Sequence, residues 1–327
     1  MQVVDMHCDT VVSIMNKRHD GQTISLRNND LDIDLTKMQN GQYLLQNFAI
    51  FTPFGKVESP EHHALQGIDM FYQLMEENKD VIAPVLSYDD IQKNSDANKM
   101  SALLTLEEGG VVFNDLAVLR DYYRLGVRMI CLTWNYFNGI GHPNFTPGND
   151  SRSDMLHTTN DQDGLTSFGK DYVKEMERLG IIVDVSHLGD KGFWDVVEIT
   201  TKPFVASHSN ARAVCSVARN LTDEMIRALY QKGGVMGINF CDDFLSDDGN
   251  GTIEMMVRHI DHIKQVAGIE VIGMGTDFDG IAKRKELSDA SQMPLLANAL
   301  HDHGYTTEQI DAIMGRNVLR VYQAILK

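Results

Sequence analysis

Histidine and acidic residues recur at the ends of apolar, strand-like runs in this sequence. The first run, VVDMHCD, places His7 two residues before Asp9. Side chains alternate between the two faces of a strand, so His7 and Asp9 should point the same way and Cys8 the other way. Imidazole and carboxylate groups are good metal ligands. A single His-x-Asp is more often the polar end of an ordinary strand, so the rest of the chain must decide.

Later runs end in the same residue types, namely Glu107, Glu108, His187, His208, Asp277 and Asp279. Each has an ordinary structural explanation alone, because an aspartate at a strand end often caps the next helix and a lone histidine is usually a hydrogen-bonded structural residue. One metal centre would explain them all together. The set contains no thiolate, which favours zinc, with manganese or iron as alternatives.

The number of donors favours two ions. A catalytic zinc usually has three protein ligands and one water, which is fewer than this set provides. We expect His7 and Asp9 to hold one ion, His187 and His208 to hold the other, and Glu108 to bridge them. Two ions this close generate hydroxide at neutral pH and stabilise attacking and leaving groups together.

The elements that must position these residues alternate between strands and helices. Eight runs, near-continuous in apolar residues as in parallel strands covered on both faces, span 3–9, 44–51, 102–108, 127–134, 181–187, 203–209, 234–240 and 271–278. Helix-like segments follow at 60–79, 114–125, 166–179, 189–200, 222–232, 252–267 and 306–325. This order predicts a (β/α)8 TIM barrel, whose working face lies at the carboxyl ends of the strands. A doubly wound open sheet is the alternative, but no GxGxxG follows the first strand.

Length and composition fit one barrel domain over residues 1–327, with 43% hydrophobic residues. The long polar connections 10–43 and 135–165 should form loops or small additions over one barrel face. A net charge of −17 disfavours nucleic acid and anionic membranes as partners. The four cysteines form no CxxC and should be buried free thiols. No signal peptide or membrane span is apparent, so we expect a cytoplasmic protein.

The other histidines have more ordinary explanations. Six lie on polar helix faces or in loops and should be solvated: His62, His63, His259, His262, His301 and His303. His142 and His157 lie in the connection 135–165, which could turn them toward the site.

In their joint order these motifs resemble the membrane dipeptidase family, also called renal dipeptidase-like enzymes, among the amidohydrolase-type metal-dependent barrels. The likeness covers nearly the whole chain, through DMHCD, EEGG, GLTSFGKDYVKEMERLGIIVDVSH, SHSNARAVCSVARN, GMGTDFDG and GRNVLRV. The resemblance implies a binuclear zinc site, hydrolysis of dipeptides and often a homodimer.

The resemblance also implies a role for each matching residue. His7, Asp9, His187 and His208 match metal ligands. Glu108, just before Gly109–Gly110, matches the bridging glutamate, whereas Glu107 stands where the family usually has an apolar residue.

Three further residues match substrate or proton-transfer positions. Arg219 in ARN matches the arginine that holds the substrate, and Asp277 in GTDFDG matches the aspartate that exchanges protons with the bridging water. Trp134 in LTWN stands where mammalian members carry a substrate-contacting histidine. A tryptophan N–H can donate one hydrogen bond, but the side chain cannot carry a charge or bind a metal.

Two alternatives to a dipeptidase stay open. Another amide, lactam or ester hydrolase could use the same metal pair, although Arg219 disfavours neutral substrates. A metal-binding barrel that has lost activity could serve as an interaction protein; the intact ligand candidates and Asp277 oppose this, and Trp134 is the only feature in its favour.

Overall fold

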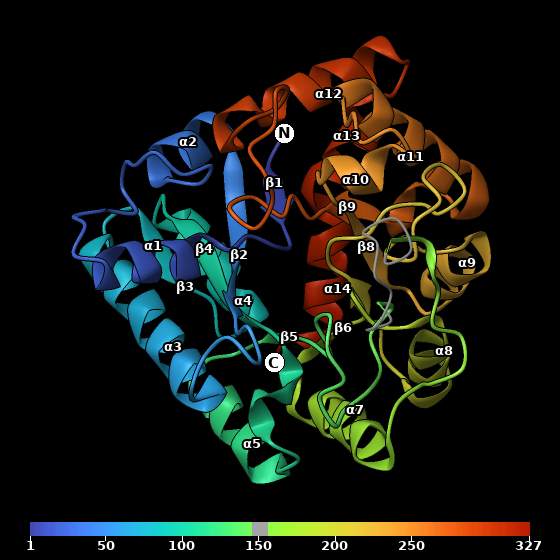
Figure 1. Ribbon diagram of the computed structural model, residues 1–327. Coiled ribbons are helices and arrows are strands. Elements are labelled where there is room, and N and C mark those ends of the chain that lie inside the picture. The colour runs from blue at the N-terminus through green and yellow to red at the C-terminus, as the bar shows by residue number, and fades with distance from the viewer. Residues whose placement is uncertain (146–155) are drawn as a thin grey trace.

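A closed barrel of parallel strands lies at the centre of the molecule, a computed structural model that describes residues 1–145 and 156–327 (Figure 1). The strands of this described part are β1 (Val3–Asp5), β2 (Tyr43–Phe51), β3 (Ile82–Pro84), β4 (Met100–Glu107), β5 (Met129–Cys131), β6 (Ile182–Asp184), β7 (Val205–Ala206), β8 (Val235–Ile238) and β9 (Ile272–Met274). They are ordered β2-β1-β9-β8-β7-β6-β5-β4, and β4 pairs back with β2. This ring confirms the predicted (β/α)8 barrel.

β3 is the strand that the sequence pattern did not reveal. It pairs in parallel with the first residues of β4, through Ile82 and Met100, while β5 pairs with the last residues of β4. β3 is therefore an addition at the amino end of the barrel wall and leaves the ring of eight strands unchanged.

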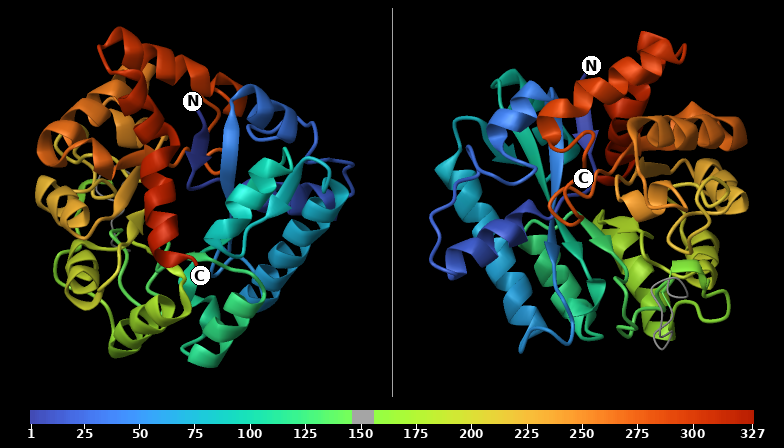
Figure 2. Two further views of the ribbon diagram at one scale, coloured as in Figure 1. Left: turned by 180° about the vertical axis from the view of Figure 1, so that it is seen from behind. Right: turned by 45° about the horizontal axis from the view of Figure 1, so that its top comes forward.

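Helices surround the barrel on the outside (Figures 1 and 2). Those that match predicted segments are α3 (Pro60–Glu77), α5 (Leu116–Arg124), α7 (Ser167–Leu179), α8 (Asp190–Ile199), α9 (Asp223–Gln231) and α11 (Ile253–Ala267). The predicted segment 306–325 is divided into α13 (Thr307–Asp311), a π-helical stretch (Ala312–Arg316) and α14 (Asn317–Ile325). The starts follow capping chemistry, since Thr166 and Thr222 each accept a hydrogen bond from the backbone of the first turn.

Several helices lie where the sequence suggested connections. The segment 10–43 contains α1 (Thr10–His19) and α2 (Leu35–Asn40), and α4 (Tyr88–Asp96), α10 (Asp242–Leu245) and α12 (Met293–Asp302) also went unpredicted. Short 3-10 turns lie at Gly109–Val112, Ile269–Val271 and Ala290–Gln292. The connection 135–165 includes residues 146–155, which lie outside the described residues. In its described part, one bridge joins Gly141 to Leu165 at the end of the same connection, and another joins Pro143 to Leu188, which follows β6.

The buried apolar side chains form two clusters, one between the barrel wall and the surrounding helices and one at the base of the barrel. The larger joins strand residues such as Leu104 and Leu106 to the surrounding helices. The smaller joins Leu103 and other strand residues to Val318 and Tyr322 of α14. Seen from behind, α14 lies across the middle of the molecule (Figure 2, left). The side chains of α14 thus pack on the end of the barrel opposite the functional rim.

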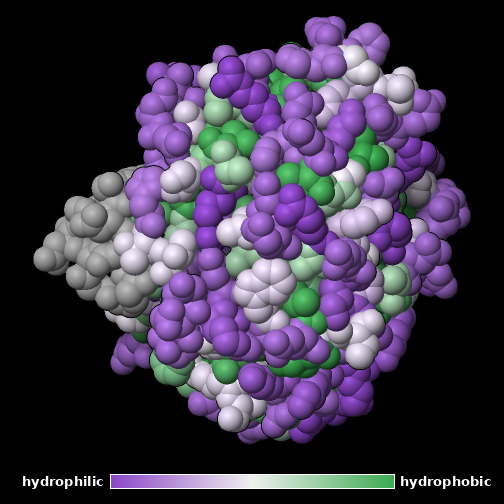
Figure 3. Space-filling view, turned by 90° about the vertical axis from the view of Figure 1, so that its right-hand side faces the viewer, coloured by the Kyte–Doolittle hydropathy of each residue, from purple (hydrophilic) through white to green (hydrophobic). Residues whose placement is uncertain are grey.

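The surface and the thiols agree with the composition. The helical face seen in Figure 3 is mostly hydrophilic, with small apolar areas between polar side chains. Cys8, Cys131 and Cys215 are buried, Cys241 is partly buried, and all four are free. Among the described residues, no helix combines the length and the apolar character that crossing a membrane requires.

His259 corrects one expectation, because it is fully buried on α11 and not solvated. Its Nδ1 accepts a hydrogen bond from the Ala211 backbone N–H at 3.2 Å, and its Nε2 contacts the Leu245 carbonyl at 3.1 Å. His259 thereby joins the loop after β7 to the end of α10. Burial lowers its pKa to about 4, so the folded protein keeps this imidazole neutral.

The pKa of His259 makes stability depend on pH. Its pKa of about 4 in the folded chain lies below its ordinary value of 6.5, so between these values the unfolded chain binds more protons and stability falls as the pH is lowered. Metal-free protein should lose about 2 kcal/mol through this residue between pH 7 and pH 5. Urea unfolding of wild type and of His259→Gln at both pH values tests this. The free energy of unfolding should fall by about 2 kcal/mol more in wild type than in the variant. Identical pH dependence in the two proteins would contradict it.

Candidate active site

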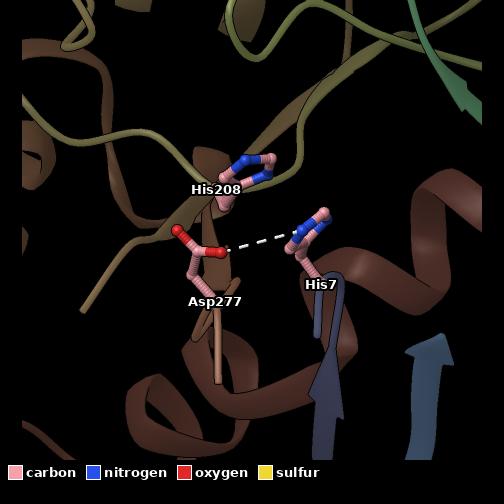
Figure 4. A group of neighbouring side chains, drawn as sticks. All are labelled: His7, His208 and Asp277. Atoms are coloured by element: carbon pink, nitrogen blue, oxygen red, sulfur yellow. Dashed lines mark ion pairs between the residues drawn. The ribbon is translucent and has the colours of Figure 1, made fainter. Parts of the chain in front are cut away.

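Six ligand-type side chains meet at the carboxyl ends of the strands. They form three overlapping groups of three whose ligand atoms lie within 4.8 Å of one another, and together these groups contain His7, Asp9, Glu107, His187, His208 and Asp277. Figure 4 shows His7, His208 and Asp277 converging from β1 and from the segments that follow β7 and β9. The structure thus brings together every predicted metal ligand except Glu108.

Glu107 lies between the two pairs of ligands. Its Oε2 is 3.4 Å from His7 Nε2, while its Oε1 is 3.2 Å from His187 Nε2 and 3.6 Å from His208 Nε2. The first pair is completed by Asp9, whose Oδ2 is 3.4 Å from His7 Nε2. One oxygen of Glu107 therefore faces each pair, which is the arrangement expected of a carboxylate shared by two ions.

Glu108 does not join this group, which corrects the assignment made from the sequence. Its carboxylate accepts hydrogen bonds from the Gly110 backbone at 2.8 Å, the Trp134 backbone at 3.1 Å and the side-chain amide of Asn138. The backbone of Glu108 is left-handed, with a φ of 99°, because the chain turns here out of β4 into the turn Gly109–Val112.

The alternation of β4 explains why Glu107 faces the centre. Leu104 and Leu106 pack against the surrounding helices, whereas Leu103 belongs to the cluster that includes α14. Glu107 shares the face of Leu103, and Glu108 follows the face of Leu104 and Leu106. The two acids face opposite ways, as expected. Glu108 was assigned as the bridge because it precedes Gly109–Gly110, whereas the apolar residues upstream on β4 indicate Glu107.

A hydrogen-bonded chain fixes the ring of His208. The buried Asp184 carboxylate accepts hydrogen bonds from the backbone N–H groups of Ser186 at 3.0 Å and Ser207 at 2.9 Å, and from the Ser207 hydroxyl. Ser207 Oγ also lies 2.7 Å from His208 Nδ1. The hydroxyl has one hydrogen, which Asp184 receives, so Oγ accepts the hydrogen on Nδ1. Nε2 is left with a free lone pair.

His187 is oriented in the same way by an amide. Its Nδ1 is 2.9 Å from Asn135 Oδ1, an atom that can only accept, so Nδ1 carries the hydrogen. The Nε2 atoms of His187 and His208 then point at each other across 3.1 Å. Burial lowers the pKa of His187 to about 4 and that of His208 well below its usual range, which keeps both rings neutral. Neutral imidazoles with free lone pairs are the form that binds a metal.

Two buried atoms without hydrogen-bond partners also fit a metal site. Within the described part of the chain, His7 Nε2 and Asp9 Oδ1 are buried and have no hydrogen-bond partner. Buried polar atoms are nearly always hydrogen-bonded, so two neighbouring ligand-type atoms without hydrogen-bond partners fit a bound cation. Three acidic side chains, Asp9, Glu107 and Asp277, lie within 3.7 Å of His7 Nε2. A cation would offset the repulsion among these carboxylates.

Asp277 lies beside the two pairs, with one oxygen turned toward His7 and the other held by Asn239. Asn239 donates a hydrogen bond to its Oδ2 at 2.9 Å, and its Oδ1 lies 3.7 Å from His7 Nε2. Burial raises its pKa to about 7, so this carboxyl can accept and release a proton near neutral pH. Gly280 makes room for it, because a Cβ there would lie 2.1 Å from Asp9 Oδ2 and 2.8 Å from Asp277 Oδ1.

A cavity of about 1010 Å³ opens above the ligands. Its walls include the predicted residues Asp9, Asp277 and Trp134, and also Phe51 and Phe244, which sequence analysis did not single out. Neither histidine of the connection 135–165 contributes to this lining: His142 packs on Phe137, and His157 contacts the Ser216 carbonyl.

Arg219 is almost completely buried and does not itself line the cavity, although Phe244, which lies against it, does. Its Nη1 donates to Ser209 Oγ at 2.7 Å, and its guanidinium lies 5.7 Å from the ring centre of Phe244. Nε and Nη2 have no hydrogen-bond partner among the described residues. Two unpaired N–H groups on a buried guanidinium suit a carboxylate, which accepts two parallel hydrogen bonds.

Fold and site together define a metal-dependent hydrolase built on a TIM barrel. The model of the membrane dipeptidase family, peptidase family M19, matches residues 1–327, and the chain belongs to this family. It is a metallo-dipeptidase, a hydrolase that acts on peptide bonds.

Individual relatives agree with this assignment. An uncharacterized protein in the pqqA 5′ region of Klebsiella pneumoniae is 35% identical over 271 residues, which cover 79% of this chain and 97% of that protein. An uncharacterized dipeptidase of Schizosaccharomyces pombe is 35% identical over 305 residues, which cover 89% of this chain and 71% of that protein. A metallo peptidase from Rhodobacter sphaeroides, solved with a phosphinate mimic of the dipeptide L-Ala-D-Ala, is 26% identical with a TM-score of 0.89 over 99% of each chain.

The chain Asp184–Ser207–His208 gives a testable expectation. Ser207→Ala removes the acceptor for His208 Nδ1–H, so it should lower metal affinity by about 10–100-fold, the usual effect of losing such a partner. Competition with a chelator of known affinity measures this directly. Ser186→Ala is the matched control, because the hydroxyl it removes accepts from the His208 backbone at 3.1 Å and lies 3.4 Å from Ser207 Oγ, whereas the hydrogen bond to His208 Nδ1 comes from Ser207. Equal metal affinity in Ser207→Ala and wild type would contradict the assigned role.

Proposed function

We propose that this metallo-dipeptidase works with two zinc ions. His7 and Asp9 would hold the first ion, His187 and His208 the second, and Glu107 would be shared. The proposal rests on the position of Glu107. Its Oε2 faces the pair that contains His7, and its Oε1 faces the pair that contains His187. Imidazole and carboxylate donors without thiolate suit zinc, and they equally accept manganese or iron.

The protein's own residues would carry out proton transfer and substrate binding. When bound, the metal pair supplies Lewis acidity, which lowers the pKa of water and polarises the peptide carbonyl. Asp277 would take a proton through Oδ1 from the attacking water and return it to the leaving amine. Asn239 would keep the other oxygen, Oδ2, turned away.

Arg219 would direct cleavage to the peptide bond next to a free C-terminus. Its unpaired N–H groups would receive the C-terminal carboxylate, which lies at a fixed distance from the last peptide bond, the only one that a dipeptide has. The restriction to dipeptides itself rests on the family to which the chain belongs. The phosphinate dipeptide mimic in the Rhodobacter sphaeroides relative supports a substrate of this size. A cytoplasmic location and a homodimer remain part of the proposal and rest on the sequence.

The two adjacent glutamates test the metal assignment. Wild type should contain two ions per chain by elemental analysis after purification without chelators, and it should hydrolyse a dipeptide. Glu107→Gln should lose at least one ion and most turnover, because it removes a charged ligand. Glu108→Gln is the matched control and should keep both ions.

Two results would contradict the assignment. A reproducible single ion in zinc-supplemented wild type would exclude the binuclear site. Loss of metal in Glu108→Gln but not in Glu107→Gln would reverse the roles of the two glutamates.

Arg219 can be tested with a substrate that lacks the charge it binds. Arg219→Ala should reduce kcat/KM for a free-acid dipeptide by an amount equal to about 2–5 kcal/mol, the cost of losing a buried partner of a charge. The loss should lie mainly in KM, since the contact is the same in ground and transition states. The C-terminal amide of the same dipeptide should be affected far less. Equal losses for acid and amide would show that Arg219 does not bind the carboxylate.

A further inference from the structure

Three aromatic side chains form a wall on one side of the cavity. Phe51 ends β2, and Trp134 and Tyr136 follow β5; all three line the cavity. The Trp134 ring centre is 5.0 Å from that of Phe51 and 5.1 Å from that of Tyr136. We call Phe51, Trp134 and Tyr136 the aromatic wall. It presents a broad apolar surface next to a group of buried charges.

Two further aromatic side chains continue the aromatic wall toward the protein surface. Tyr136 stacks on Phe54 at 6.3 Å between ring centres, and Phe54 stacks on Phe113 at 6.2 Å. The Trp134 backbone N–H donates to Glu108 at 3.1 Å. A surface held in this way is already formed before a ligand arrives, so an apolar group can bind to it at little cost in ordering.

The aromatic wall and Arg219 lie on different sides of the ligand group. In the ring β2-β1-β9-β8-β7-β6-β5-β4, Arg219 follows β7, which is opposite β2. The wall comes from β2 and from the segment after β5, with β4 and its Glu107 between them. Phe244, which lies against Arg219, follows β8, the strand opposite β4.

We propose that the aromatic wall binds the side chain of the N-terminal residue of the dipeptide and selects a large apolar one. The proposal rests on the proposed function, which places the C-terminal carboxylate at Arg219 and the peptide bond at Glu107. The N-terminal residue then extends across the ligands toward Phe51 and Trp134. Other apolar side chains also line the cavity, but Phe244 lies against Arg219, whereas the wall comes from β2 and the segment after β5 on the other side of Glu107.

Two isomeric dipeptides provide the test, because L-Phe-L-Ala and L-Ala-L-Phe differ only in the order of their residues. Wild type should hydrolyse Phe-Ala with a higher kcat/KM than Ala-Phe or Ala-Ala. Trp134→Leu and Phe51→Leu should each lower kcat/KM for Phe-Ala by about tenfold or more, mainly through KM, while Ala-Ala changes by about twofold at most. Phe137→Ala is the control, since Phe137 is an aromatic side chain of the same loop that is exposed and does not line the cavity.

The outcomes distinguish the proposed N-terminal subsite from the proposed dipeptidase function. Equal losses for Phe-Ala and Ala-Ala in both variants, or a wild-type preference for Ala-Phe, would overturn the wall as the N-terminal subsite and leave the dipeptidase intact. A metal-loaded wild type that hydrolyses none of the three dipeptides would overturn the proposed function and the subsite with it. The two variants alter different strands, so misfolding of one leaves the other to decide.

Discussion

The site depends on holding like charges together at the floor of the cavity, among side chains that are mostly buried. Asp9, Glu107 and Asp277 each place an oxygen within 3.7 Å of the single atom His7 Nε2. Carboxylates in such a place repel one another and lose hydration, so they stay together only where the surrounding chain holds each of them in position. Much of the rim is arranged to do this.

The backbone contributes through unusual conformations and close contacts. His187 and Asp277 are both left-handed, with φ of 68° and 63°, in a region that non-glycine residues seldom adopt. Behind them, the Ser207 carbonyl lies where a Cβ on Gly237 or Gly275 would come within 2.0 Å and 1.8 Å of it. These two glycines let β8 and β9 approach the segment that carries His208. The ligand group is thus fixed by the packing of whole strands as well as by local hydrogen bonds.

The sequence predicted the barrel and most of the ligand-type side chains that meet at its rim for one reason. The carboxyl ends of parallel strands meet at one rim, so residues far apart in the chain could be assigned to one place from strand endings alone. It could not show which glutamate faces inward without the register of β4, which depends on which of its apolar residues contact helices. Asn135, Asn239 and Ser207 were missed because a polar residue near a ligand has no pattern until the fold reveals its partner.

Glu108 shows what the second glutamate does in place of bridging. Burial raises its pKa to about 7, and as an anion it accepts hydrogen bonds from Gly110, Trp134 and Asn138. Those bonds fix the start of the segment after β5. The same segment supplies Asn135, which orients His187, and the ring of Trp134, which lines the cavity. The two adjacent acids therefore act on opposite faces of β4: Glu107 lies among the ligands, while Glu108 holds the loop that orients one ligand and forms part of the aromatic wall.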